Sequence, residues 1–180
     1  MIVHNTILQT NNKTINININ KIKVRVTLKG KGIRKGELKM VKINLNETEE
    51  IEITSTFKQS VKGFVREYDY NNQFEVTVKT NEGKTITFDY HISIDETNKG
   101  KKVLSDNDHI QAFDSFINDA ISGRYSFDEF MDEYGYTKCK EGYKIWKLCQ
   151  ESSTKYDSLN IDIDLYDLSN IVREKYPDVV

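Results

Sequence analysis

Hydrophobic and polar residues alternate with a period of two through the first half of the chain. In the stretch TINININ, Ile15, Ile17 and Ile19 fall on one face and asparagines on the other. The alternation continues through residues 21–29 with the opposite parity, because Ile22 opens the second apolar series. A period of two is that of a β-strand with one buried face. The pattern therefore predicts two strands, with a turn, bend or bulge at residues 20–21.

Further stretches continue the strand pattern without an intervening helix. They cover residues 37–45, 50–57, 64–70, 74–80 and 84–94. The last two flank Asn81, Glu82 and Gly83, a three-residue loop in which glycine suits the left-handed backbone position. Short strands at regular spacing favour an antiparallel sheet or a partly closed barrel.

The hydrophobic period changes to 3.6 after residues 95–102, a polar stretch that we interpret as a linker. A first helix is predicted to begin at Ser105 or Asp106 and to end at Gly123. Its apolar face holds Ile110, Phe113, Ile117, Ala120 and Ile121.

The most strongly specified helix lies within residues 126–136, SFDEFMDEYGY. Ser126 and Glu129 have the spacing of a capping box, in which each side chain satisfies a backbone N–H at the helix start. Gly135 can take the left-handed conformation that ends a helix. The apolar stripe consists of Phe127, Phe130, Met131 and Tyr134.

Two more helices complete the C-terminal half. The third covers residues 141–155, and the fourth begins at Asp162 or Asp164 and ends before Pro177. In the third helix the predicted buried stripe is Tyr143, Trp146, Cys149 and Ser152, with Ile145 and Leu148 beside it. In the fourth helix the predicted buried residues are Leu165, Leu168, Ile171 and Val172.

The pattern as a whole predicts an α+β fold. Residues 1–98 form an antiparallel β-rich region, and residues 103–180 form a bundle of about four helices that can pack against it as one domain.

Charge is distributed unevenly along the chain, although the net charge is only −2. Residues 21–42 carry one acidic residue and many basic ones, whereas the helical half is acidic. The candidate basic surface for a partner or a nucleic acid consists of Lys21, Lys23, Arg25, Lys29, Lys31, Arg34, Lys35 and Lys39. The candidate acidic surface for a partner consists of Asp128, Asp132 and Glu133.

Each charged surface has a plainer interpretation. Lysines on the outer face of a strand also protect a sheet edge from aggregation. Asp and Glu near a helix start also complement the helix dipole. The basic stretch contains no aromatic residue, which argues against a single-strand stacking site.

Candidate chemistry is sparse. His4, His91, His109, Cys139 and Cys149 show no metal-ligand spacing, so we expect no metal, no cofactor and no catalytic residue. Cys149 falls on an apolar stripe and is expected in the core. The N-terminal residues lack the pattern of a signal peptide, and no apolar run approaches the ~20 residues of a membrane span. We therefore expect a soluble protein of a reducing cytoplasm.

Residues 88–159 resemble a domain found in phage and prophage proteins. The motifs that carry the resemblance are FDY at Phe88, FINDAISG at Phe116, SFDEFMDEYGY at Ser126 and YKIWKLCQES at Tyr143. Met131 stands where that family often has cysteine, and residues 137–142 depart from its acidic turn. The resemblance implies a mobile-element origin and a bacterial host cell, and it brings no assigned activity.

These observations favour an interaction protein over an enzyme. The specific hypothesis is a phage-encoded inhibitor of a bacterial defence system, which binds a CRISPR effector nuclease or its guide RNA complex. The alternative is a phage protein that binds nucleic acid through the basic β surface. A third hypothesis, an enzyme acting on a small signalling molecule, requires a pocket that gathers His91, His109 or Cys139.

Overall fold

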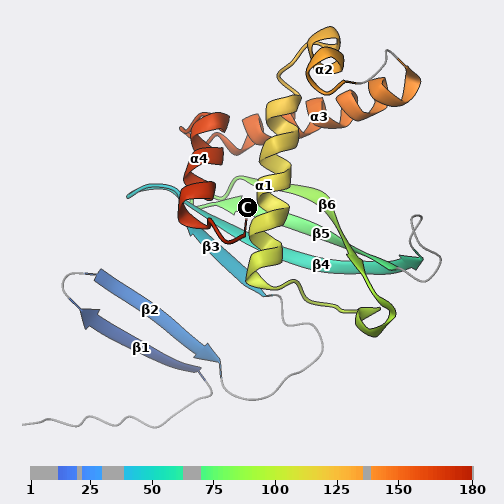
Figure 1. Cartoon of the computed structure of the whole chain (residues 1–180). Helices are drawn as coiled ribbons and strands as arrows, with labels where there is room; N and C mark the ends of the chain where they lie inside the picture. Colours follow the sequence, from blue (N-terminus) through green and yellow to red (C-terminus); the bar gives the residue numbers. More distant parts are fainter. Residues whose placement is uncertain (1–11, 20–21, 30–38, 63–69, 136–138, 180) are drawn as a thin grey trace, which may run out of the picture. The chain divides into compact units, whose positions relative to one another are not determined.

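A computed structural model of the chain describes residues 12–19, 22–29, 39–62, 70–135 and 139–179. The chain divides into two compact units, residues 1–37 and residues 38–180 (Figure 1). Each unit is described by itself below.

The first unit contains an antiparallel pair of strands, β1 (Asn12–Ile19) and β2 (Ile22–Lys29). Asn12 pairs with Lys29 at one end of the ladder and Ile19 with Ile22 at the other. These strands coincide with the two alternating stretches of the sequence. Residues 20–21, where the parity changes, lie outside the described residues.

The second unit contains an antiparallel sheet in the order β3-β4-β5-β6. Its strands are β3 (Met40–Asn44), β4 (Glu50–Lys62), β5 (Tyr70–Thr80) and β6 (Thr85–Ile94). The sheet is open, with β3 and β6 at its two edges, so the barrel is not the form observed. The strand predicted at residues 64–70 lies outside the described residues except for Tyr70, which begins β5.

The loop between β5 and β6 has the predicted geometry. The backbone N–H of Thr80 donates to the Lys84 carbonyl oxygen at 2.9 Å, which closes the hairpin. Gly83 has φ +87°, the left-handed conformation that side chains disfavour. The loop therefore fixes the register in which β6 pairs with β5.

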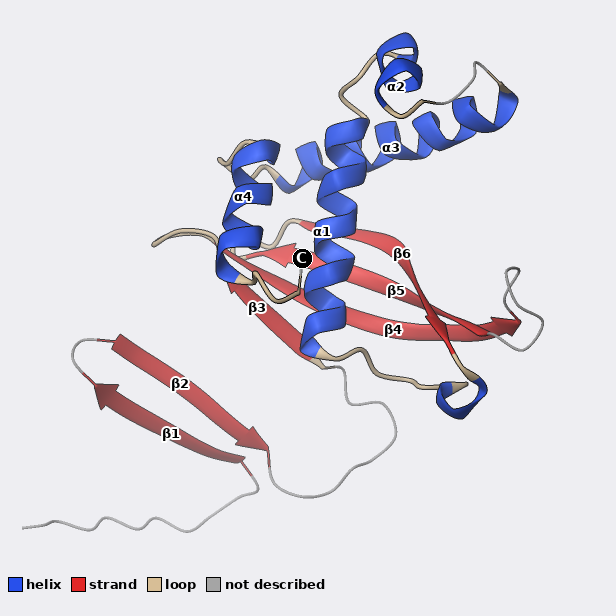
Figure 2. Cartoon of the chain, viewed as in Figure 1, coloured by secondary structure: helices blue, strands red, loops and turns tan. Residues whose placement is uncertain are grey.

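Four α-helices follow the sheet, as predicted (Figure 2). They are α1 (Asp106–Ser122), α2 (Phe127–Glu133), α3 (Lys140–Leu159) and α4 (Leu165–Lys175). Ser105 and Ser126 each form a capping box, with Asp108 and Glu129 respectively. Asp164 caps α4. The predicted linker at residues 95–102 includes a short 3-10 helix, η1 (Glu96–Asn98).

One core joins the sheet to the helices. Ile53 and Val76 of the sheet are fully buried in the same cluster as Phe113 and Ile117 of α1 and Leu168 of α4. The helix α1 lies across the sheet face in Figure 1. The alternation of the strands and the 3.6 period of the helices thus define two layers around one interior.

The buried face of α3 differs from the prediction. Cys149, Ser153, Tyr156 and Leu159 are buried, whereas Leu148 is 62% exposed. Tyr143 is 46% and Ile145 38% exposed. The predicted stripe advanced in steps of three, and each step turns about 60° short of a full helical turn, so that stripe drifts around the helix. Steps of four and three from Cys149 instead keep one face toward the core.

The first half of α3 packs against α2 rather than against the main core. Phe130, Met131 and Cys149 form a second, smaller buried cluster, and Phe127 and Trp146 pack beside it. This cluster confirms the prediction that Cys149 is a core residue. It is too small to cover every apolar side chain on α3, which explains why Tyr143 and Ile145 stay exposed.

Candidate functional site

A groove with a volume of about 400 Å³ opens between β6, α1 and α3. The strand contributes Phe88, Asp89, Tyr90 and His91, and α1 contributes Ala112, Ser115, Phe116 and Asp119. The helix α3 contributes Leu148, Glu151, Ser152 and Lys155. The groove is within the size range of ligand-binding clefts in proteins.

The floor of the groove is apolar. Phe88 points to the helical side of β6, where its ring stacks on Phe116 with 4.9 Å between the centroids and 14° between the planes. Phe116 is buried and Phe88 is half-buried, so part of the stacked pair remains accessible. Ala112 of α1 is fully buried and also lines the groove.

The opposite wall comes from α3. Leu148, Glu151, Ser152 and Lys155 are spaced by one, three or four residues, so they share one helix face. Leu148 is the most exposed of the large apolar residues in the described chain. An exposed leucine at the mouth of a groove with an aromatic floor is a feature of binding surfaces.

Charged groups surround this apolar centre. Asp119 of α1 and Glu151 of α3 supply carboxylates, and Lys155 supplies one ammonium group. Desolvation by the surrounding protein raises the pKa of the Asp119 carboxyl. Asp89 is engaged with Lys58, whose Nζ lies 2.5 Å from Asp89 Oδ1. The groove therefore carries a surplus of negative charge.

Cys149 belongs to the buried α2–α3 cluster and does not line the groove. Burial and the nearby Asp119 carboxylate raise the pKa of its thiol to about 11. The reactive form of cysteine is the thiolate. Cys149 therefore acts as a small apolar residue of the α2–α3 cluster.

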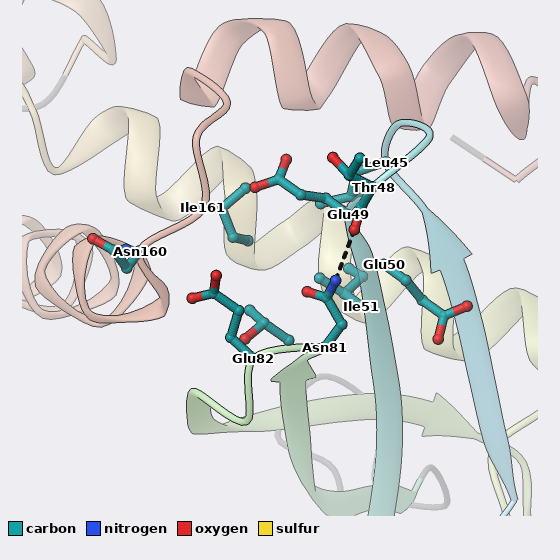
Figure 3. Close-up of a pocket in the computed structure, with 10 residues that line it drawn as sticks. Leu45, Thr48, Glu49, Glu50, Ile51, Asn81, Glu82, Asn160 and Ile161 are labelled. Carbon is teal, nitrogen blue, oxygen red and sulfur yellow. Dashed lines mark hydrogen bonds between the residues drawn. The ribbon is translucent and has the colours of Figure 1, made fainter.

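A second pocket of about 200 Å³ lies at the end of the sheet near β3 and β4 (Figure 3). Its walls include Glu49, Glu50 and Glu82, and the Asn81 side-chain amide donates to the Thr48 carbonyl oxygen at 2.7 Å. The backbone N–H of Asp162 donates to Glu49 Oε1 at 3.2 Å. Within the described ranges, no group of three or more His, Cys, Asp or Glu side chains is arranged to hold a metal ion.

The predicted basic residues are spread over both units. Lys23, Arg25 and Lys29 are in β2, where they pair in register with Asn18, Asn16 and Asn12. Lys39 belongs to the second unit, and its Nζ lies 2.8 Å from Asp106 Oδ1 at the start of α1. Lys21, Lys31, Arg34 and Lys35 lie outside the described residues.

The predicted acidic residues lie together on α2. Asp128, Asp132 and Glu133 are all exposed on this seven-residue helix. None of them lines the groove. The acidic surface of α2 and the groove are therefore two separate candidate contacts.

The side chains required by the enzyme hypothesis are dispersed. His91 lines the groove, whereas His109 is fully buried near the start of α1. Cys139 is exposed and caps α3, with its Sγ accepting the Gly142 N–H at 3.4 Å. His109 and Cys139 line neither the groove nor the pocket at the end of the sheet.

Sequence reasoning missed the groove. Phe88, Asp119 and Leu148 are 60 residues apart from first to last, and their juxtaposition depends on how α1 and α3 cross beside β6. The sequence pattern placed Leu148 beside the predicted buried stripe of its helix, whereas the structure leaves it 62% exposed in the lining of the groove. None of the helices in the described ranges combines the length and apolarity of a membrane span.

Comparison with protein-family models, curated proteins and solved structures finds no match for this chain.

Proposed function

We propose that this protein acts by binding another protein, and that the groove between β6, α1 and α3 is its contact surface. The observation that carries the proposal is Leu148, a 62% exposed leucine beside the stacked rings of Phe88 and Phe116. Burying the exposed 62% of this side chain against a partner contributes about 1–2 kcal/mol. The dispersed histidines and the protonated Cys149 thiol give no support to catalysis.

The partner class comes from the resemblance to phage and prophage proteins. Every residue that lines the groove lies within residues 88–159, the segment that resembles that domain. We propose that this is a phage or prophage protein of the bacterial cytoplasm that inhibits a host defence system. The specific target that we propose is a CRISPR effector nuclease. The acidic surface of α2 supports a contact with a basic nucleic-acid channel of such an enzyme, because exposed carboxylates can occupy the positions of phosphates.

The test is a DNA-cleavage assay with purified effector–guide RNA complexes of several CRISPR types. The wild-type protein is expected to lower cleavage by at least one of them, and Leu148→Lys is expected to lose most of that effect. Met40→Lys is the matched control, because Met40 is a 47% exposed apolar residue on β3, at the opposite edge of the sheet. Unimpaired cleavage by every complex, with no complex retained on the immobilised protein, would refute the proposed partner.

A second candidate function is nucleic-acid binding through β2. Lys23, Arg25 and Lys29 occupy positions of the same parity in β2, one step apart and then two, with about 6.6 Å per step, a spacing that can follow phosphates. A gel-shift assay should then show affinity that falls steeply with salt. The charge-reversed triple variant Lys23→Glu, Arg25→Glu, Lys29→Glu should abolish the shift. Unchanged binding by this variant would exclude β2 as the contact.

A further inference from the structure

The strand β6 is at the edge of the described sheet, and four consecutive residues of it, 88–91, line the groove. The Thr80 N–H bonds to the Lys84 carbonyl, so this pair is a hydrogen-bonded pair of the β5–β6 ladder. Such pairs recur at every second residue of an antiparallel ladder, which makes Val76–Phe88 another of them. The residues between them direct their N–H and C=O groups away from β5. Thr87, Asp89 and His91 therefore present these groups at the sheet edge.

This edge lacks several of the features that normally prevent strand pairing. The strand β6 is ten residues long, contains neither proline nor lysine, and pairs with β5 without a register shift. By contrast, the β4–β5 ladder has an irregularity between Phe57 and Gln59, and the other edge strand, β3, has only five residues. Long and regular edges without lysine or proline are templates for an added strand.

We infer that β6 binds an extended segment of the partner protein, which adds to the sheet as a further antiparallel or parallel strand. This inference rests on the proposed protein-binding function and specifies its geometry. Backbone hydrogen bonds to Thr87, Asp89 and His91 supply affinity, and alternate side chains of the segment enter the groove.

The groove determines the chemistry of that segment. A side chain on the helical side of the added strand meets the rings of Phe88 and Phe116 and the Leu148 side chain, so it is apolar. Its neighbours on the same face meet the carboxylates of Asp119 and Glu151. These two negative charges outnumber the one positive charge that Lys155 contributes. The segment is therefore a short stretch with an apolar residue flanked by lysine or arginine at alternate positions.

Selection of a display library of random twelve-residue peptides on the immobilised protein tests this inference. We expect selected peptides to contain the apolar residue with basic residues two positions away. Their affinity, measured by fluorescence anisotropy, should fall at least tenfold on Thr87→Pro and stay within twofold on Thr87→Ala. Proline removes the outward N–H without breaking the β5 ladder, whereas alanine keeps it.

Leu148→Lys provides a second measurement, which does not depend on how β6 tolerates proline. Leu148 is exposed, so this variant should fold and should lose binding of the same peptides at least tenfold. Selected peptides that bind Thr87→Pro and Leu148→Lys as tightly as wild type would overturn strand addition while leaving a protein-binding function intact. Recovery of no peptide, or self-association of the chain through β6 in sedimentation, would overturn the inferred partner segment.

Discussion

The indole Nε1–H of Trp146 donates to the backbone carbonyl oxygen of Tyr125 at 2.9 Å. This bond joins the middle of α3 to the turn that precedes α2. The Trp146 ring also lies 5.5 Å, centroid to centroid, from the ring of Phe127 at the start of α2. One side chain therefore holds the orientation of α2 on α3 by a polar and an aromatic contact together.

Trp146→Phe should lower the free energy of unfolding by about 1–2 kcal/mol, because the partly buried Tyr125 carbonyl loses its donor while an aromatic ring is kept. Urea unfolding monitored by circular dichroism measures this change. Tyr143→Phe is the control, since it removes a hydroxyl and keeps the ring that contacts Trp146. An equal loss of stability in both variants would contradict the role of the indole bond.

Gly123, at the end of α1, lies against the backbone of α3. A Cβ atom at this position would lie 2.1 Å from the Cys149 carbonyl oxygen, although the φ of −70° suits any residue. Gly123→Ala should therefore destabilise the fold by about 3 kcal/mol through a clash of one backbone with another. Thermal and urea unfolding of the purified variant measure this loss.

Gly135→Ala separates steric crowding from backbone strain. Gly135 has φ +63°, and a Cβ there meets nothing within 4 Å. Gly135→Ala should lower the free energy of unfolding by only ~1–2 kcal/mol, which is the cost of holding alanine in the left-handed conformation. If Gly123→Ala proved as mild as Gly135→Ala, the close crossing of α1 and α3 would not be a packing constraint.

Features that depend on neighbouring residues could be predicted from the sequence. The capping boxes at Ser105 and Ser126 each involve residues three positions apart, so their spacing carries the whole signal, and for Ser126 the partner Glu129 was identified. The left-handed Gly83 and Gly135 are local for the same reason. The alternation of apolar and polar residues in β3 and β5 coincides with the alternating burial of their side chains.

Features that depend on distant packing could not be predicted. The second half of α3 buries the face that meets the main core, and its first half buries the face that meets α2. Neither contact can be inferred from the spacing of apolar residues within α3. The groove has the same origin. Phe88 and Leu148 each fit a local pattern, but only the crossing of α1 and α3 beside the sheet edge brings them to one surface.

Stability should fall as the pH decreases from about 7 to 5, because His109 is fully buried and neither ring nitrogen has a hydrogen-bond partner within the described structure. Desolvation lowers its pKa, aided by Lys39 and opposed by Asp106 and Asp108. Below about pH 6.5 the unfolded chain therefore binds a proton at His109 that the folded chain does not bind. The free energy of unfolding falls by about 1.4 kcal/mol for each unit by which folding lowers the His109 pKa. Urea unfolding at pH 7 and pH 5 should reveal this slope in wild type and in His91→Gln, whose side chain is exposed. In His109→Phe the slope should be lost, and its persistence there would assign the pH dependence to another group.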